Sequence, residues 1–463
     1  MMQFDRRAMI ASAGAGLAIL SLPRRATAQA AGAPRLLEAR EAKAALRALP
    51  AEPTTTLGYG GLPEDAVLRY RPGEEIWLRL VNGLKQPTSL HVHGPRLPAI
   101  MAGVAGLSQE PVAPGASYDI RFTPRDTGLS WFHPHALPYT GEQLARGLYG
   151  VVIVEEKEPP VADADIVAVL SDWRLDARGS IVEDFGKDGL GKPEDAFQHG
   201  RIGPLVTLNG LPVPQARALA PGARVRLRIV NAANARIMLL TFAGLKPLIL
   251  AIDGQPCEAF APVADTIPVG PGARFDMMFD LPREAGASGK LVLNGNEYKK
   301  GAPEPERDIL VFKAEGAPRA ALPPIGSLPQ NPNLPPAIRL QDSQRFDVTI
   351  EGGGKAPFTL NRATPKDARG GLPLFLLKTG QPVTLGIANK TAFAQSIRLH
   401  GCHMRLLHPA DDGWEPYWRD SIILPVGKTH HVAFNADNPG RWMLESPIID
   451  HAANGVRGWF EVG

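Results

Sequence analysis

Two segments of the chain each occur three times, and this internal repeat restricts the fold more than any other feature. The first is a Gly turn followed by an alternating strand and an Asn, at residues 72–82, 221–231 and, more weakly, 379–389. The second leads to a further Gly, and its copies are residues 114–122, 271–279 and 426–434. Because the copies lie about 150 residues apart, the repeat indicates three related domains rather than a solenoid of short units.

Short alternating strands between Gly and Pro turns are typical of β-sandwiches, and the chain has 48 Gly and 45 Pro. We therefore predict an all-β protein of three tandem Greek-key β-sandwich domains. Their predicted extents are residues 36–160, 161–317 and 342–463, with a Pro-rich linker at 318–341. Residues 176–203 are rich in charge and Gly and predict a surface loop of the middle domain.

Residues 1–28 have the features of an export signal. Arg6 and Arg7 precede an apolar run at residues 8–22, and the Ala-Thr-Ala sequence that ends at Ala28 offers a cleavage site. Adjacent arginines favour the twin-arginine route, so the twin-arginine export machinery is an expected partner. The apolar run is too short to span a bilayer. We expect a periplasmic protein, cleaved near Ala28, without a membrane span.

The charge balance and the cysteines narrow the expected partners further. The formal net charge is +3, and residues 1–28 carry four Arg and one Asp, so the mature chain is close to neutral. A near-neutral chain gives no reason to expect a nucleic-acid partner. Cys257 and Cys402 are the two cysteines, which does not suggest a disulfide framework. We expect a monomer.

Two His-x-His pairs lie in the first repeat, His91 with His93 and His133 with His135. Because residues i and i+2 of a strand point to the same face, each pair offers two imidazoles on one side. Neutral imidazole is a ligand that suits copper and zinc. One such pair on a polar strand could be chance, but two pairs in one domain predict a metal site.

The repeat also aligns these pairs with the C-terminal copy. There Arg398 and His400 align with His91 and His93. The three residues Glu445-Ser446-Pro447 align with His133-Pro134-His135. The middle copy has no ligand at either place. The metal site is therefore expected between the first and third domains, with the middle domain as a spacer.

These motifs resemble those of the multicopper oxidases that consist of three cupredoxin-like domains. Residues 103–115, 147–150, 253–256 and 438–442 also match family segments, and the resemblance covers essentially the whole mature chain. It implies three cupredoxin-like β-sandwiches. It also implies an oxidoreductase in which a type 1 copper takes electrons from substrate and a type 2/type 3 cluster reduces dioxygen.

The chain departs from the family at the type 1 site. Family motif three, His-Pro-x-His-Leu-His-Gly, here begins with Gln395, and family motif four, His-Cys-His-x-x-x-His-x4-Met, here has Ser446 for its Cys and Val456 for its Met. His451 is what remains of that site. A serine hydroxyl stays protonated near neutral pH and cannot replace a thiolate. We therefore expect no laccase-type oxidation and assign no catalytic residue.

The rest of the cluster leaves two readings open. In one, the site holds one or two copper ions, with zinc as an alternative, through His91, His93, His133, His135, His400 and Glu445. In the other, an Arg398–Glu445 ion pair fills the pocket and the histidines only form hydrogen bonds. A guanidinium at the type 2 position disfavours a cation, whereas Glu445 can bind a metal through oxygen.

Three functions follow from these readings. The first is a periplasmic copper-binding protein with a reduced cluster. The second is a metal-free scaffold with a periplasmic protein partner, similar to SufI-type relatives. The third is a copper-dependent oxidoreductase in which electrons enter through Cys402 or directly at the cluster, so it stays open whether the chain is an enzyme. For Cys402 the competing explanation is a buried, unreactive thiol.

Overall fold

The computed structural model describes residues 32–48, 51–60, 67–186, 188–299, 301–363, 371–407 and 413–463. In this part of the chain, strands and turns account for nearly all of the structure and the α-helices are three short segments: α1 (Thr140–Ala145), α2 (Pro193–Ala196) and α3 (Ile449–Ala453). The prediction of an all-β fold is confirmed. The predicted leader, residues 1–28, lies outside the described residues.

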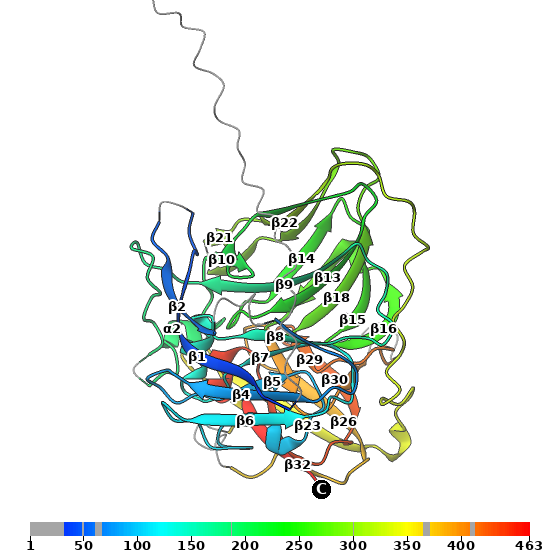
Figure 1. The fold of residues 1–463 in the computed structure, drawn as a ribbon. Helices are drawn as coiled ribbons and strands as arrows, with labels where there is room; N and C mark the ends of the chain where they lie inside the picture. Colours follow the sequence, from blue (N-terminus) through cyan, green and yellow to red (C-terminus); the bar gives the residue numbers. More distant parts are fainter. Residues whose placement is uncertain are drawn as a thin grey trace, which may run out of the picture. The chain divides into compact units, whose positions relative to one another are not determined.

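The strands form three successive pairs of sheets (Figure 1). The first pair has the strand orders β2-β1-β4-β6 and β3-β8-β7-β5. Its strands are β1 (Arg35–Ala44), β2 (Thr54–Tyr59), β3 (Val67–Tyr70), β4 (Ile76–Asn82), β5 (His91–His93), β6 (Ser117–Phe122), β7 (Gly128–His133) and β8 (Gly150–Val154).

The second pair consists of a seven-stranded sheet, β11-β10-β9-β13-β18-β15-β16, and a five-stranded sheet, β12-β22-β19-β14-β17. Its strands are β9 (Ala164–Trp173), β10 (Leu205–Leu208), β11 (Leu211–Pro212), β12 (Gln215–Leu219), β13 (Arg224–Asn231), β14 (Met238–Ala243), β15 (Leu248–Ile252), β16 (Gln255–Phe260), β17 (Thr266–Val269), β18 (Arg274–Asp280), β19 (Ser288–Leu293) and β22 (Arg307–Ala314). A separate hairpin joins β20 (Asn296–Lys299) to β21 (Ala302–Glu304).

The third pair has the orders β24-β23-β26-β30-β28 and β25-β32-β31-β27-β29. Its strands are β23 (Gln344–Gly353), β24 (Ala356–Leu360), β25 (Leu376–Leu377), β26 (Pro382–Asn389), β27 (Gln395–Leu399), β28 (Met404–Leu406), β29 (Ser421–Leu424), β30 (Thr429–Asn435), β31 (Gly440–Glu445) and β32 (Arg457–Val462). The predicted domain boundaries at residues 160, 317 and 341 stay predictions.

The structure explains why the two repeated segments recur together. They form antiparallel neighbours in every sheet pair, as β4 with β6, β13 with β18 and β26 with β30. The Asn that ends the first segment is buried in all three copies, and its side-chain amide donates to backbone carbonyls of two loops. Buried carbonyls need such partners, so the Asn is required where strand and loops meet.

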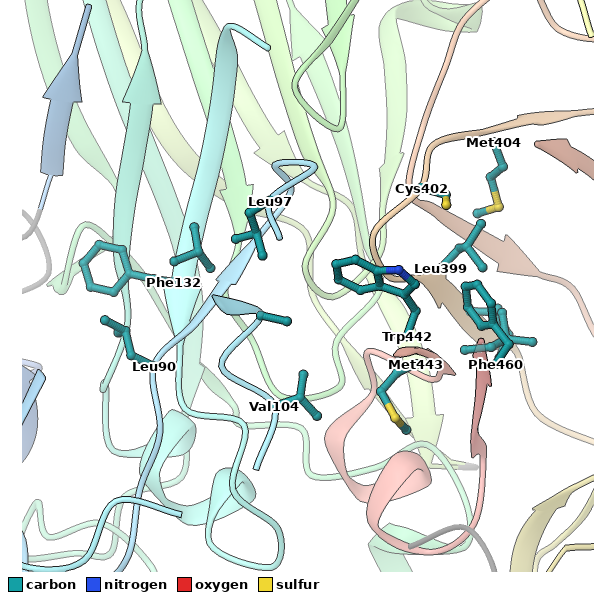
Figure 2. Close-up of a cluster of buried hydrophobic side chains, with 14 of the residues drawn as sticks. Leu90, Leu97, Val104, Phe132, Leu399, Cys402, Met404, Trp442, Met443 and Phe460 are labelled. Atoms are coloured by element: carbon teal, nitrogen blue, oxygen red, sulfur yellow. The ribbon is translucent and has the colours of Figure 1, made fainter. Parts of the chain in front are cut away.

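One hydrophobic core joins the first and third sheet pairs, whereas the second pair has a core of its own. In Figure 2, Leu97 and Val104 come from the first pair, and Trp442 and Met443 from β31 of the third. The Asn438 side chain fixes this contact because its Nδ2 donates to the Leu97 carbonyl at 3.0 Å. The two regions that carry the predicted ligands therefore share one core.

Residues 176–203, predicted as a surface loop, pack partly into the protein. Asp184 and Arg201 in this segment are buried and form an ion pair at 2.7 Å, and α2 lies against α3. Because Asp184 and Arg201 neutralise each other, both can be buried in a segment rich in charge. Within the part of the chain that the structure describes, no helix is both long and apolar enough to span a bilayer.

Candidate metal centre

The two His-x-His pairs lie side by side, as predicted. Strand β5 pairs antiparallel with β7, so that His91 is opposite His133 and His93 is opposite Trp131. His135 follows β7 directly. The His91 ring centre lies 5.3 Å from that of His133 and 5.4 Å from that of His135. Strand alternation and pairing therefore bring the four imidazoles together.

The third sheet pair completes the cluster from the other side. Strands β27 and β31 pair with Arg398 opposite Glu445, and His400 follows β27. All the predicted ligand residues are buried, and their nitrogen and oxygen atoms form two groups, each with its members within 4.8 Å of one another. The groups are His91 with His93 and His133, and His135 with His400 and Glu445.

In the first group, His91 has no ring nitrogen left for a ligand. Arg398 Nη1 donates to His91 Nε2 at 2.7 Å, so the ring proton is on Nδ1, which contacts the Ala102 carbonyl. By contrast, the Nε2 atoms of His93 and His133 have no hydrogen-bond partner.

In the second group, the Glu445 carboxylate turns toward the histidines. Its Oε1 lies 2.5 Å from His135 Nε2 and 3.0 Å from His400 Nε2, while Oε2 is buried without a partner. Among the described residues no ion pair links Glu445 to Arg398, although the two are opposite in the β27–β31 register. Arg398 Nη1 instead donates to His91 Nε2, and it lies 3.2 Å from His400 Nε2.

Burial sets the protonation states of the cluster. It lowers the pKa of His91, His93 and His133 well below the usual range, and that of His400 to about 3. These imidazoles are therefore neutral, which is the form that binds metals. Burial alone would raise the pKa of Glu445, but the neighbouring histidines hold it well below its usual value. Glu445 is thus a carboxylate.

Arg398 is the positively charged residue of the cluster. Burial lowers its pKa to about 10, which still leaves the guanidinium protonated at neutral pH. Between the two groups lies a cavity of about 20 Å³, lined in part by His93, His133 and Glu445 as well as Arg398. This volume holds about one water-sized species.

Sequence reasoning missed Asp420 and Arg274, which are both buried behind His93. Arg274 donates two hydrogen bonds to Asp420, at 3.0 and 2.9 Å, and Asp420 Oδ1 lies 3.6 Å from His93 Nε2. Arg274 belongs to β18, and a Cβ on the nearby Gly272 would lie 2.7 Å from the His93 ring. The middle sheet pair therefore contributes no predicted ligand but is more than a spacer, which corrects the sequence interpretation.

A second buried region, the His451 corner, consists of Gln395, Ser446, His451 and Val456. His451 Nε2 donates to the Gln198 carbonyl at 3.0 Å, and its Nδ1 lies 2.8 Å from Gln395 Oε1. Burial lowers the pKa of His451 to about 3, so the ring is neutral. Residues 176–203, which include Gln198, therefore cover this corner.

Both cysteines are free and buried. Burial raises the pKa of the Cys402 thiol to about 12, so it is protonated, and Figure 2 places it beside Met404 in the shared core. Among the described residues, neither Cys belongs to a group that could hold a metal. The structure thus supports the buried, unreactive thiol.

Sequence models of the multicopper oxidase family match residues 45–159 and 333–463. A solved multi-copper oxidase from Pseudomonas thermotolerans is 30% identical and superposes with a TM-score of 0.80, over 93% of this chain and 99% of that one. The chain belongs to the multicopper oxidase family. Its three sheet pairs are therefore of the cupredoxin-like type, as the resemblance implied.

Curated relatives include multicopper oxidase MmcO from Mycobacterium tuberculosis, which is 28% identical over 437 residues, 87% of this chain and 82% of that protein. Copper resistance protein A from Escherichia coli is 31% identical over 235 residues. That match covers 42% of this chain and 38% of the relative.

Proposed function

We propose that this member of the multicopper oxidase family binds copper in a reduced cluster between the first and third sheet pairs. The candidate ligands are His93, His133, His135, His400 and Glu445, and His91 joins them only where Arg398 releases its Nε2. The observation that carries the proposal is a set of buried atoms without partners: Nε2 of His93 and His133 and Oε2 of Glu445. Such atoms are costly unless something binds them, and neutral imidazole with carboxylate suits copper or zinc.

The His451 corner gives the second part of the proposal, the absence of laccase-type turnover. Gln395 and Ser446 offer no thiolate, and both ring nitrogens of His451 lie against protein oxygens, Gln395 Oε1 and the Gln198 carbonyl. Bound copper would supply one-electron chemistry and affinity for dioxygen. The residues of the cluster would hold it with neutral imidazoles, exclude water and offset its charge with Glu445.

Export to the periplasm through the twin-arginine machinery belongs to the same proposal and rests on Arg6, Arg7 and the apolar run that follows. A copper resistance protein among the relatives is consistent with copper handling there. No nucleic-acid partner is expected, and we keep the expectation of a monomer.

One observation favours a metal-free scaffold as the second candidate. Arg398 lies 2.7 Å from His91 Nε2, so a cation already fills part of the cluster. A copper-dependent oxidoreductase of a non-standard kind ranks third, because the raised pKa of Cys402 opposes electron entry through a thiolate.

Metal analysis after loading with Cu(II) and with Zn(II), followed by dialysis, tests the proposal. We expect stoichiometric metal in the wild type and its loss in the His133→Ala, His135→Ala double variant. His431→Ala is the matched control, because His431 is exposed on β30 and belongs to neither group. Wild-type protein without bound metal would support the scaffold. Copper-dependent turnover of a phenol would contradict the expected loss of electron entry.

A further inference from the structure

We infer that His135, His400 and Glu445 form a mononuclear site for one divalent cation, and that Arg398 takes the place of a second metal at His91. The inference rests on the proposed function and goes beyond it, because it assigns one ion, one donor set and one oxidation class. Two imidazoles and a carboxylate replace the all-imidazole cluster that the family resemblance implies.

The second group already has nearly the geometry that such an ion needs. Ligand atoms 2.0–2.1 Å from a tetrahedral ion lie about 3.3 Å apart. In the structure, Glu445 Oε1 is 2.5 Å from His135 Nε2 and 3.0 Å from His400 Nε2. Small outward shifts of these side chains therefore make room for the ion, and the unpartnered Glu445 Oε2 can complete its coordination.

The donor atoms select the class of ion. Two neutral imidazoles and a carboxylate are known ligand sets for Zn(II) and Fe(II), and carboxylate oxygen is a hard donor. Cu(I) prefers soft sulfur ligands, and neither metal-binding group among the described residues includes a cysteine. The site therefore favours Zn(II), Cu(II) or Fe(II) over Cu(I).

Arg398 limits the number of ions to one. Its Nη1 donates to His91 Nε2 at 2.7 Å, which removes the lone pair that His91 would offer a metal. Its contact with His400 is longer, at 3.2 Å, so His400 can exchange it for an ion. The first group then retains only His93 and His133 as donors, beside a fixed positive charge that repels a cation.

The test is Zn(II) and Cu(II) binding by full-length protein with titration and metal analysis, together with electron paramagnetic resonance of the Cu(II) form. We expect one ion per chain and two coordinating nitrogens. Glu445→Gln should lower the affinity at least ~100-fold, the upper end of the loss seen even for residues that only support a ligand. His431→Ala, the control, should stay within about threefold, because His431 is exposed on β30 and belongs to neither group.

Glu445→His keeps a ligand at this position and should restore binding if Glu445→Gln fails to fold. The inference is overturned if wild-type protein takes up two ions. It is also overturned if Glu445→Gln binds normally while His93→Ala and His133→Ala do not, a result that would leave the proposed copper binding intact. Wild-type protein that binds neither ion overturns both proposals.

Discussion

The histidine cluster and the His451 corner are both buried, and they differ in how near their ring nitrogens lie to protein oxygens. In the corner, His451 Nε2 donates to the Gln198 carbonyl, and Nδ1 lies 2.8 Å from Gln395 Oε1. In the cluster, His93 and His133 each keep a buried nitrogen without a partner.

The polar atoms of the His451 corner lie against other protein atoms, whereas the cluster keeps atoms that are available to a ligand. Protein interiors rarely leave buried polar atoms unpaired, since each costs about 1–3 kcal/mol. In the corner, His451 Nε2 follows this rule, because it donates to the Gln198 carbonyl. The cluster departs from it, and its one substituted cation, Arg398, satisfies His91 alone. The predictions below test this contrast.

The largest effect is expected for Arg274→Ala. Arg274 is fully buried and paired with Asp420, so its removal leaves an uncompensated charge behind His93. Breaking such a pair typically costs about 3–5 kcal/mol of unfolding free energy, which urea denaturation would measure. Arg121→Ala breaks an exposed pair with Glu75 and should leave stability near that of the wild type. Equal losses of unfolding free energy in the two variants would show that the buried Arg274–Asp420 pair does not stabilise the cluster.

Asp450, which precedes His451 in the sequence, should make the stability of the protein depend on pH. Burial raises its pKa to about 6, although Arg201 donates a backbone hydrogen bond to it. The native state therefore holds this proton up to about pH 6, whereas the unfolded chain releases it near pH 4. Stability should fall as pH rises from about 4 to about 6, by up to about 3 kcal/mol.

Asp450→Asn is the control for this profile, because an amide oxygen can still accept the Arg201 N–H. Thermal denaturation at closely spaced pH values should show the decrease in the wild type and a smaller one in the variant. The lowered pKa of Asp420 has the opposite sign, since it contributes stability above about pH 4 that is lost on acidification. Identical profiles for wild type and Asp450→Asn would rule out the role of Asp450.

The sequence predicted the parts of the cluster that depend on strand periodicity. Alternation placed His91 and His93 on one face, and the pairing of β5 with β7 confirms that the two His-x-His strands are neighbours. Periodicity could not show where a side chain turns among several partners. Glu445 is opposite Arg398 in the sheet but contacts His135, which comes from another sheet pair.

The sequence also could not predict contacts between segments that are far apart along the chain. Arg274 and Asp420 are 146 positions apart, and each alone resembles an ordinary polar residue of a β-protein. The Pro-Gly-Ala-Arg repeat that contains Arg274 was visible, but its second role behind His93 depends on how the middle sheet pair meets the third. The Gly and charge content of residues 176–203 likewise gave no sign that Gln198 covers His451.

A smaller effect separates two histidine truncations in metal-free protein. His451→Ala leaves the Gln198 carbonyl, a group of another segment, without its donor, whereas His133 Nδ1 contacts only the adjacent Pro134 carbonyl and its Nε2 has no partner. Since both rings are buried, their loss of packing is similar. We expect His451→Ala to be about 1–2 kcal/mol more destabilising in urea denaturation. The reverse order would mean that the cluster, rather than the corner, is the satisfied region.

The smallest expected effect is on Cys402, whose thiol would matter only if it replaced the missing ligand of the corner. Burial raises its pKa to about 12, so almost no thiolate exists at pH 8. Iodoacetamide should therefore leave Cys402 unmodified in native protein and modify it after unfolding, as read by peptide mass spectrometry. Cys402→Ala should leave metal content unchanged. Rapid alkylation of the native protein, or loss of metal in Cys402→Ala, would indicate that a thiolate takes part in metal binding. The two regions would then no longer differ as described.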